Sequence, residues 1–213
     1  MRIGLIADIH GDFGGLQRAL EILDESKVDT ILCAGDVVER GHEGDRVIAL
    51  LRERAIPCVK GNHEYILLSK DKSMRETGSP GGLGFRQLTD ESLAYIEALP
   101  DRLSLEVGGK TILLAHATPW DDFTFAFPTS RPKLFQRIAA AANSDIVILG
   151  HTHEPLVARV GATWIFNPGS IIPAGSQTCA TLDLPDMVMT VVRLHNRAVV
   201  DNVPLLEIEA GTG

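Results

Sequence analysis

Five apolar stretches of this sequence each stop abruptly at Asp, Asn or His, and this recurring pattern strongly constrains what the chain can fold into. The first stretch runs from Ile3 to Ala7 and is followed at once by Asp8 and His10. Residues two apart in an extended chain point to the same side, so we expect these two side chains to converge on one atom. A carboxylate and an imidazole together suit Mn, Fe, Co, Ni or Zn.

The same arrangement recurs four more times along the chain. The polar residues that follow the later stretches are Asp36, Asn62, His63, His116, His151 and His153. Ligands of open α/β sheets bind beyond the carboxyl ends of the strands, so we expect all these side chains on one rim. A single histidine would be interpreted as structural, but five of the seven histidines stand at such positions. Packing alone does not explain that set, which indicates a metal site.

Hydrophobic periodicity predicts alternating strands and helices first and a strand-rich second half. The predicted strands are 2–7, 30–34, 56–60, 103–107, 111–115, 146–149, 157–160, 163–166, 180–184 and 187–194. The predicted helices are 13–27, 43–54, 65–70, one after the N-cap Thr89 that runs through Leu99, and 133–142. The order predicts an α/β fold in which a parallel sheet grows into a mixed one, with antiparallel strands behind it. We expect a single domain over residues 1–213 and a frayed tail from Glu207.

Composition narrows the functional classes. The chain carries a formal net charge of −8 and shows no basic stripe, which disfavours long nucleic acid as a partner. The three cysteines have no zinc-site spacing and are interpreted as buried reduced thiols. Neither a signal-peptide pattern nor an apolar run of membrane-spanning length is visible, so we expect a cytoplasmic protein without a membrane partner.

The candidate residues suit two divalent metal ions that share one carboxylate. A bridging Asp36 would allow two cations to sit ~3.5–4 Å apart, as in two-metal hydrolases. The cations would offset the acidic charge of the protein and make a shared hydroxide available to attack phosphorus at neutral pH. His63 adjoins the candidate ligand Asn62 and is therefore a candidate general acid.

Five short blocks, taken in order, resemble the calcineurin-like metallophosphoesterases. They read Asp8-Ile9-His10, Gly35-Asp36, Gly61-Asn62-His63-Glu64, His116 and Gly150-His151-Thr152-His153. The resemblance implies a four-layer α/β/β/α sandwich with mixed sheets. It implies one metal ion on Asp8, His10, Asp36 and His153, and a second on Asp36, Asn62, His116 and His151. His63 matches the proton donor of the family, and the last block resembles the small bacterial and archaeal phosphodiesterase branch.

A second resemblance involves the stretch from Gly35 to Gly41. It is similar to the G-D-x-V-D-R-G block of serine/threonine phosphatases and dinucleoside tetraphosphatases. That likeness implies that Glu39 orients the catalytic histidine and that Arg40 binds phosphate, although the family has Asp where this chain has Glu39. The alternative interpretation is a solvated charge pair before the next helix.

Two loops, 74–84 and 118–131, are predicted to form lids over the substrate site, because long irregular loops in compact domains often bind ligands. Trp120 and the phenylalanines of the second loop would stack on a nucleobase, an aromatic leaving group or a partner protein, or else cover the sheet edge. These aromatic residues are also the sequence's hint of a homo-oligomer. The turn from Asn167 to Ser170 is interpreted as a structural element beside the site.

The sequence therefore predicts a metal-dependent phosphoesterase that acts on a small phosphate ester. Phosphodiester hydrolysis by a metal-bridging hydroxide, with His63 as general acid, is the first hypothesis. A phosphomonoesterase acting on a phosphoprotein, nucleotide or dinucleoside polyphosphate is the second. A protein-binding scaffold with the same fold, and a sensor that binds metal or nucleotide without turnover, are the alternatives from other classes.

Overall fold

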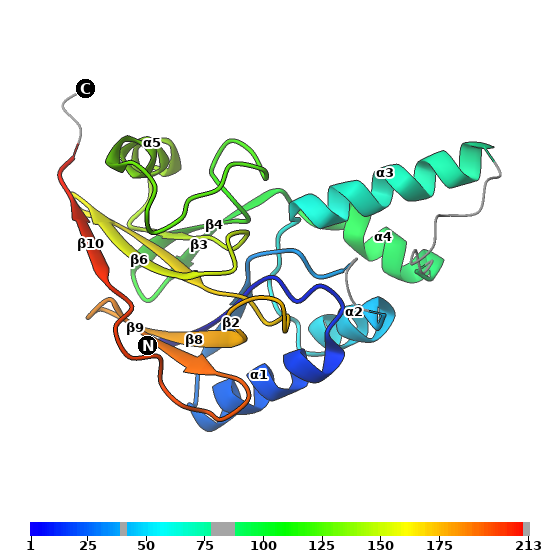
Figure 1. Cartoon of the computed structure of the whole chain (residues 1–213), viewed down its shortest axis with the longest axis horizontal. Helices are drawn as coiled ribbons and strands as arrows, with labels where there is room; N and C mark the ends of the chain where they lie inside the picture. The colour runs from blue at the N-terminus through cyan, green and yellow to red at the C-terminus, as the bar shows by residue number, and fades with distance from the viewer. Residues whose placement is uncertain (39–41, 78–87, 211–213) are drawn as a thin grey trace.

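A computed structural model describes residues 1–38, 42–77 and 88–210, which form two mixed β-sheets with helices on both outer faces (Figure 1). The first sheet has the order β2-β1-β8-β9. Its strands are β1 (Arg2–Ile6), β2 (Thr30–Cys33), β8 (Thr178–Asp183) and β9 (Val188–Arg193). Strand β1 pairs in parallel with β2 and antiparallel with β8, so the N-terminal strand lies in the middle of this sheet.

The second sheet has the order β10-β6-β7-β5-β4-β3. Its strands are β3 (Arg102–Val107), β4 (Lys110–Ala115), β5 (Ile146–Ile148), β6 (Pro155–Val160), β7 (Thr163–Pro168) and β10 (Leu205–Ile208). Strand β5 is parallel to both neighbours, and the two predicted hairpins, β3–β4 and β6–β7, flank it. Strand β10 pairs in parallel with β6, so the expectation of a frayed tail from Glu207 is wrong for residues 207 and 208.

Alternation of apolar side chains along the strands creates three cores and therefore four layers. Ile6 of β1 packs with the buried faces of α1 (Phe13–Glu25) and α2 (Gly44–Glu53). Ile3 and Leu5 of the same strand pack instead against the second sheet. The opposite face of that sheet is covered by α5 (Pro132–Ala142), whose Phe135 and Ile138 are buried. The predicted α/β/β/α sandwich is confirmed.

The expected mixed sheet and the antiparallel strands behind it form two separate mixed sheets. One expectation about the sheets is corrected. The predicted strand 56–60 forms only one parallel bridge, between Cys33 and Cys58. Pro57 has no N–H to give to a ladder, and the N–H of Lys60 donates to the carbonyl of Pro100 instead of to β2.

Helix α3 (Asn62–Thr77) is longer than the predicted 65–70 segment. Residues Met74–Thr77, which were expected to open a glycine-rich lid, continue this helix because no breaker occurs before Gly78. The remainder of the predicted 74–84 loop lies outside the described residues. Helix α4 (Asp90–Ala98) begins as predicted, with the Thr89 hydroxyl accepting a hydrogen bond from the Ser92 N–H at 3.2 Å.

The three cysteines, Cys33, Cys58 and Cys179, are buried free thiols, as expected. Within the described part of the chain, no helix combines the length and apolarity required to cross a bilayer.

Candidate metal centre

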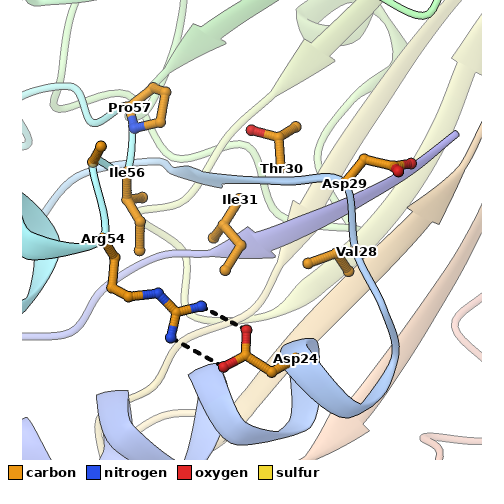
Figure 2. A pocket seen from close by; sticks show the side chains of 9 residues that line it. Asp24, Val28, Asp29, Thr30, Ile31, Arg54, Ile56 and Pro57 are labelled. Carbon is orange, nitrogen blue, oxygen red and sulfur yellow. Dashed lines mark hydrogen bonds and ion pairs between the residues drawn. The ribbon is translucent and has the colours of Figure 1, made fainter.

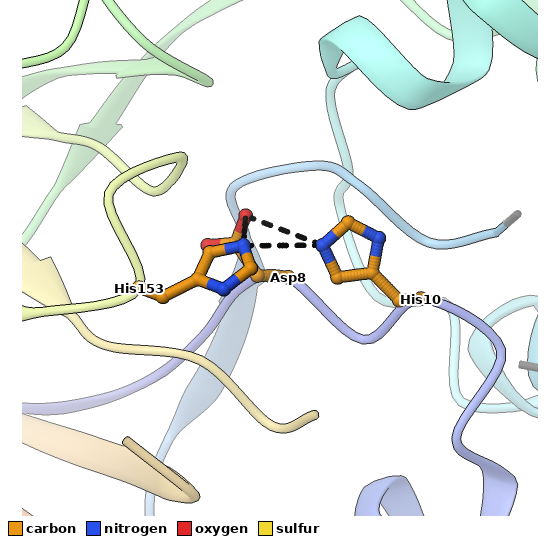
Figure 3. A group of neighbouring side chains, drawn as sticks. All are labelled: Asp8, His10 and His153. Carbon is orange, nitrogen blue, oxygen red and sulfur yellow. Dashed lines mark hydrogen bonds and ion pairs between the residues drawn. The ribbon is translucent and has the colours of Figure 1, made fainter. Parts of the chain in front are cut away.

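Three side chains from two distant parts of the sequence converge beside the end of β1 (Figure 3). Asp8 and His10 lie in the loop after β1, and His153 lies in the loop after β5. The Nε2 atoms of His10 and His153 are 3.2 Å apart, and Nε2 of His153 is 3.3 Å from Oδ1 of Asp8. Asp8 and His10 are completely buried, so this first cluster is a compact set of one carboxylate and two imidazoles.

A second cluster adjoins the first and contains Asp36, His116 and His151. Oδ2 of Asp36 lies 3.6 Å from Nε2 of His10 and 3.3 Å from Nε2 of His116. Nε2 of His116 is also 3.1 Å from Oδ1 of Asn62. The ring of His151 lies edge-on to that of His116, with 5.0 Å between centroids. Asp36 is therefore placed to contact a cation in either cluster.

Backbone hydrogen bonds determine which nitrogen of each imidazole faces the second cluster. Nδ1 of His116 lies 2.7 Å from the carbonyl oxygen of Ala34 and donates to it, which leaves Nε2 directed at Asp36. Nε2 of His151 lies 3.3 Å from the carbonyl oxygen of Phe123. A proton on this nitrogen leaves Nδ1 of His151 as the ligand atom.

The loops that carry these residues have an unusual backbone. Left-handed φ angles between 51° and 67° occur at Asp8, His10, Asp36, His151 and His153. Asp and His adopt this region more readily than most residues, and it turns the chain sharply away from each strand. Asp8 and His10 therefore converge because of tight turns, which corrects the expectation that an extended backbone aligns them.

Glu64 anchors the turn that carries Asp36. Its buried carboxylate accepts hydrogen bonds from the N–H groups of Asp36, Val37, Val38 and Gly61 at 3.0, 2.8, 3.1 and 2.7 Å. Gly61 is required at its position because a Cβ there would lie 2.1 Å from Oδ1 of Asp36. Each residue of the G-N-H-E block therefore has its own part: Gly61 lets the chain pass close to Asp36, Asn62 is a candidate ligand, His63 is a candidate acid, and Glu64 anchors the turn.

His63 lies at the edge of the first cluster, in the first turn of α3. Its backbone N–H donates to Oδ1 of Asp36 at 2.9 Å. Its ring lies edge-on to that of His10, with 4.6 Å between centroids, and its Nε2 is 3.9 Å from Oδ2 of Asp36. The side chain is 13% exposed, so it has access to a bound substrate while the ligands beneath it are shielded.

The electrostatics of the metal-free site reflect this crowding. Burial opposes ionisation of Asp36, but the neighbouring imidazoles, His116 foremost, hold its pKa below the ordinary value. Burial alone would lower the pKa of His116, but the charge of Asp36 raises it to about 10. Burial, together with the charge of His116, lowers the pKa of His151 to about 4. Burial, followed by the charge of Asp36, raises the pKa of Glu64 to about 8, although the backbone N–H groups that donate to it lower this pKa.

The donor set fits divalent transition metals. Three groups of three side chains each place their ligand atoms within 4.8 Å of one another. The groups are Asp8, His10, His153; His10, Asp36, His63; and Asp36, His116, His151. A donor set that combines carboxylates with imidazoles favours Mn, Fe, Co, Ni or Zn over Mg or Ca.

All seven ligands predicted from the sequence, and His63, are brought together here. Glu39 and Arg40 lie outside the described residues.

Glu64 belongs to the G-N-H-E block, but the sequence analysis assigned it no role. The signal for its anchoring function is its position three residues after Gly61, at the start of a helix. The turn from Asn167 to Ser170 was expected to be structural, and Asn167 has such a role: its side-chain NH₂ donates to the Gly150 carbonyl at 2.6 Å and lies 3.1 Å from the Thr152 hydroxyl.

The aromatic loop 118–131 contains both half-buried and exposed rings. Trp120 packs beside the α5 core and under the guanidinium of Arg137, which is 3.9 Å from the ring centroid. This residue therefore covers the sheet, as one of the alternatives predicted. Phe123 and Phe125 are 58% and 51% exposed, and the Phe125 ring stacks on His151 with 4.1 Å between centroids.

A separate cavity of about 210 Å³ lies between the end of α1 and residues 54–57 (Figure 2). Thr30 and Ile31, at the start of β2, line it, whereas Asp36 follows the opposite end of that strand. Asp24 and Arg54 meet across it in a two-bond ion pair, with N–O distances of 3.0 and 2.5 Å. The third charged group, Asp29, accepts a hydrogen bond from the Arg2 N–H at 2.7 Å, and none of the candidate metal ligands lines the cavity.

Comparison with known proteins gives consistent findings. A family model described as the calcineurin-like phosphoesterase superfamily domain matches residues 1–187, which include all the candidate ligands. Serine/threonine-protein phosphatase 1 of Salmonella typhimurium is 30% identical over 176 residues, which cover 74% of this chain and 81% of the relative. Phosphodiesterase YfcE of Escherichia coli is 22% identical over 215 positions, covering 96% of this chain and 98% of the relative. The crystal structure of a hypothetical protein from Pyrococcus horikoshii matches with a TM-score of 0.78 at 19% identity, covering 90% and 87% of the two chains.

Proposed function

The chain belongs to the calcineurin-like phosphoesterase superfamily and is a hydrolytic enzyme; on this basis we propose that it hydrolyses a phosphodiester with two divalent metal ions. The observation that carries the proposal is the pair of adjoining clusters, which Asp36 of the second links to His10 of the first across 3.6 Å, with His63 beside them. Asp8, His10, Asp36 and His153 would hold one ion. Asp36, Asn62, His116 and His151 would hold the other.

Each part of the chain has a distinct role in this reaction. When bound, the two ions supply a hydroxide at neutral pH and positive charge that stabilises the phosphate in the transition state. His63 holds the proton that the leaving oxygen takes up as its bond to phosphorus breaks. Glu64 keeps Asp36 in position through its backbone. The carbonyls of Ala34 and Phe123 orient His116 and His151.

The preference for a diester rests on the relatives. The relative named a phosphodiesterase aligns with almost the whole chain, whereas the one named a phosphatase covers 74% of it. The higher identity of the phosphatase, 30% against 22%, keeps a phosphomonoesterase as the second candidate. Phosphoprotein, nucleotide and dinucleoside polyphosphate are the substrates of that alternative.

A direct test compares two chromogenic esters after metal exchange. Protein stripped with chelator and reloaded with Mn²⁺ should hydrolyse bis(p-nitrophenyl) phosphate faster than p-nitrophenyl phosphate. Activity should disappear with chelator and return with Mn²⁺. A faster reaction with the monoester would favour the phosphatase. A protein that binds two ions but turns over neither ester would contradict the proposal and favour the scaffold or sensor.

Glu39 and Arg40 enter the proposal on sequence grounds alone. Arg40 would bind a non-bridging phosphate oxygen, and Glu39 would orient His63. Substituting Arg40 by Ala should then raise KM for phosphate esters and leave the bound-metal count at two. Unchanged kinetics would remove Arg40 from the site. The cytoplasmic location, the single domain and the homo-oligomer stay predictions from the sequence.

A further inference from the structure

The segment Asp121–Phe127 brings exposed aromatic rings to the rim of the second cluster. Phe123 and Phe125 are the exposed phenylalanines of the described chain. The Phe125 ring stacks on the candidate ligand His151 with an interplanar angle of 23°, and Phe127 lies nearly parallel to Phe125, at 5° and 5.4 Å. Exposing large apolar rings to water costs free energy. Two such rings beside a candidate metal ligand therefore indicate a binding surface.

This segment is built to hold its shape without a partner. Oδ1 of Asp121 accepts hydrogen bonds from the N–H groups of Phe123 and Thr124 at 2.8 and 2.7 Å. The Thr124 hydroxyl donates to Oδ2 of Asp121 at 2.8 Å. Thr118 bonds to Asp121 through both its N–H and its hydroxyl. The rings are therefore presented in fixed positions, as binding surfaces require.

The charges around the rings disfavour an additional anion. Asp121 and Asp122 are both acidic, and the guanidinium of Arg102 is engaged by Asp122, with 2.7 Å between Nη1 and Oδ1. The side chains of Arg102 and Asp122 are 19% and 7% exposed, so little solvent reaches this pair. A neutral planar ring suits this surface, whereas a further phosphate does not.

The position of the rings also indicates which part of the substrate reaches them. His63 groups with His10 and Asp36, whereas His151 groups with Asp36 and His116. The leaving oxygen must approach the proton donor His63. A ring that contacts Phe125 is therefore attached to the other ester oxygen, the one that stays on phosphorus.

We propose that Phe123 and Phe125 form a subsite for a planar aromatic group, such as a nucleobase, carried by the ester substituent that remains bonded to phosphorus. This inference rests on the proposed phosphodiesterase function and specifies its substrate class. Offset or edge-to-face contact with the exposed parts of the two rings would supply the recognition.

The test uses two diesters with one leaving group. Thymidine 5′-(p-nitrophenyl phosphate) carries a nucleobase on the retained substituent, and methyl p-nitrophenyl phosphate carries none. In Mn²⁺-loaded protein, Phe125→Ala should lower the ratio of kcat/KM for the thymidine ester over the methyl ester by roughly tenfold. Phe123→Ala should lower it in the same direction. Val188→Ala should leave both rates unchanged, because this exposed residue of β9 lies across β8 from Arg2, at the end of β1 that is opposite to the site.

Calorimetric binding supplies a readout independent of turnover. Thymidine 5′-monophosphate should bind Mn²⁺-loaded wild-type protein more tightly than methyl phosphate, and Phe125→Ala should remove most of that difference. Equal losses with both diesters would mean that Phe125 only positions His151, and the subsite would be wrong. An unchanged ratio of kcat/KM would also reject the subsite, and the exposed rings would then be explained by binding to a protein partner or to a second copy of this chain. If the wild type hydrolyses neither diester, the proposed function fails, and the binding difference alone decides the subsite.

Discussion

The carboxylate of Glu64 accepts the backbone N–H of Asp36 at 3.0 Å, so the residue that links the two clusters is held by an acid 28 positions away in the sequence. Three further N–H groups donate to the same carboxylate, at 2.7 to 3.1 Å. Glu64 is fully buried, so water does not replace any of these bonds.

Replacing Glu64 by Gln should destabilise the protein by about 1.5–3 kcal/mol, because an amide NH₂ would face N–H donors in a buried pocket. Urea denaturation of metal-free protein measures the loss. The matched control is Glu53→Gln, an exposed position on α2, where we expect a change within about 0.5 kcal/mol. Equal stability of the two variants would show that the four bonds contribute little.

Single ligand substitutions should separate the two metal sites. His153→Ala removes a donor from the first cluster only, and His116→Ala removes one from the second only. Each variant should therefore retain about one Mn²⁺ per chain, and Asp36→Ala should retain neither, because this carboxylate is the proposed bridging ligand of both ions. Elemental analysis after gel filtration counts the ions. Loss of both ions from each histidine variant would argue against two separable sites.

His63→Ala should reduce turnover without changing metal content. Loss of a general acid costs about 10²–10⁴-fold when the leaving group needs a proton. The decrease should be larger for a diester with an alkoxide leaving group than for one that releases p-nitrophenolate, which leaves readily as an anion. His195→Ala, at an exposed position in the turn after β9, is the control. An equal decrease for both leaving groups would exclude the proposed role.

Asn167 should stabilise the loop that carries His151. Asn167→Asp keeps the acceptor for the Gly169 N–H but loses the NH₂ that donates to the Gly150 carbonyl. We expect a loss of about 1–3 kcal/mol in urea denaturation, because the variant places a buried carboxylate against a carbonyl. Asn196→Asp is the matched control, since exposed Asn196 only accepts, from the Ala198 N–H at 3.0 Å. Comparable stability of the two variants would contradict this role.

The sequence was informative where local pattern and chemistry coincide. The block order predicted which side chains meet, since each follows an apolar run that forms or adjoins a strand. The third run was predicted as a strand, yet Pro57 limits it to one bridge. Strand β10 was missed because Leu205–Ile208 is stabilised by pairing with β6, almost 50 residues earlier in the chain, and has no distinctive pattern of its own. The bond from Gly61 to Glu64 follows a local pattern, but the bonds that Asp36, Val37 and Val38 donate to it come from 26 to 28 positions away, which no local pattern encodes.

Five candidate site residues adopt a left-handed backbone conformation that lowers stability but positions their side chains for chemistry. They are Asp8, His10, Asp36, His151 and His153. Residues with a Cβ give up roughly 1–2 kcal/mol in this conformation, whereas glycine adopts it freely. Selection for thermal stability alone would therefore favour glycine at these positions, and each such substitution would remove a candidate metal ligand. Stabilising substitutions for this enzyme should therefore be chosen outside these five turns.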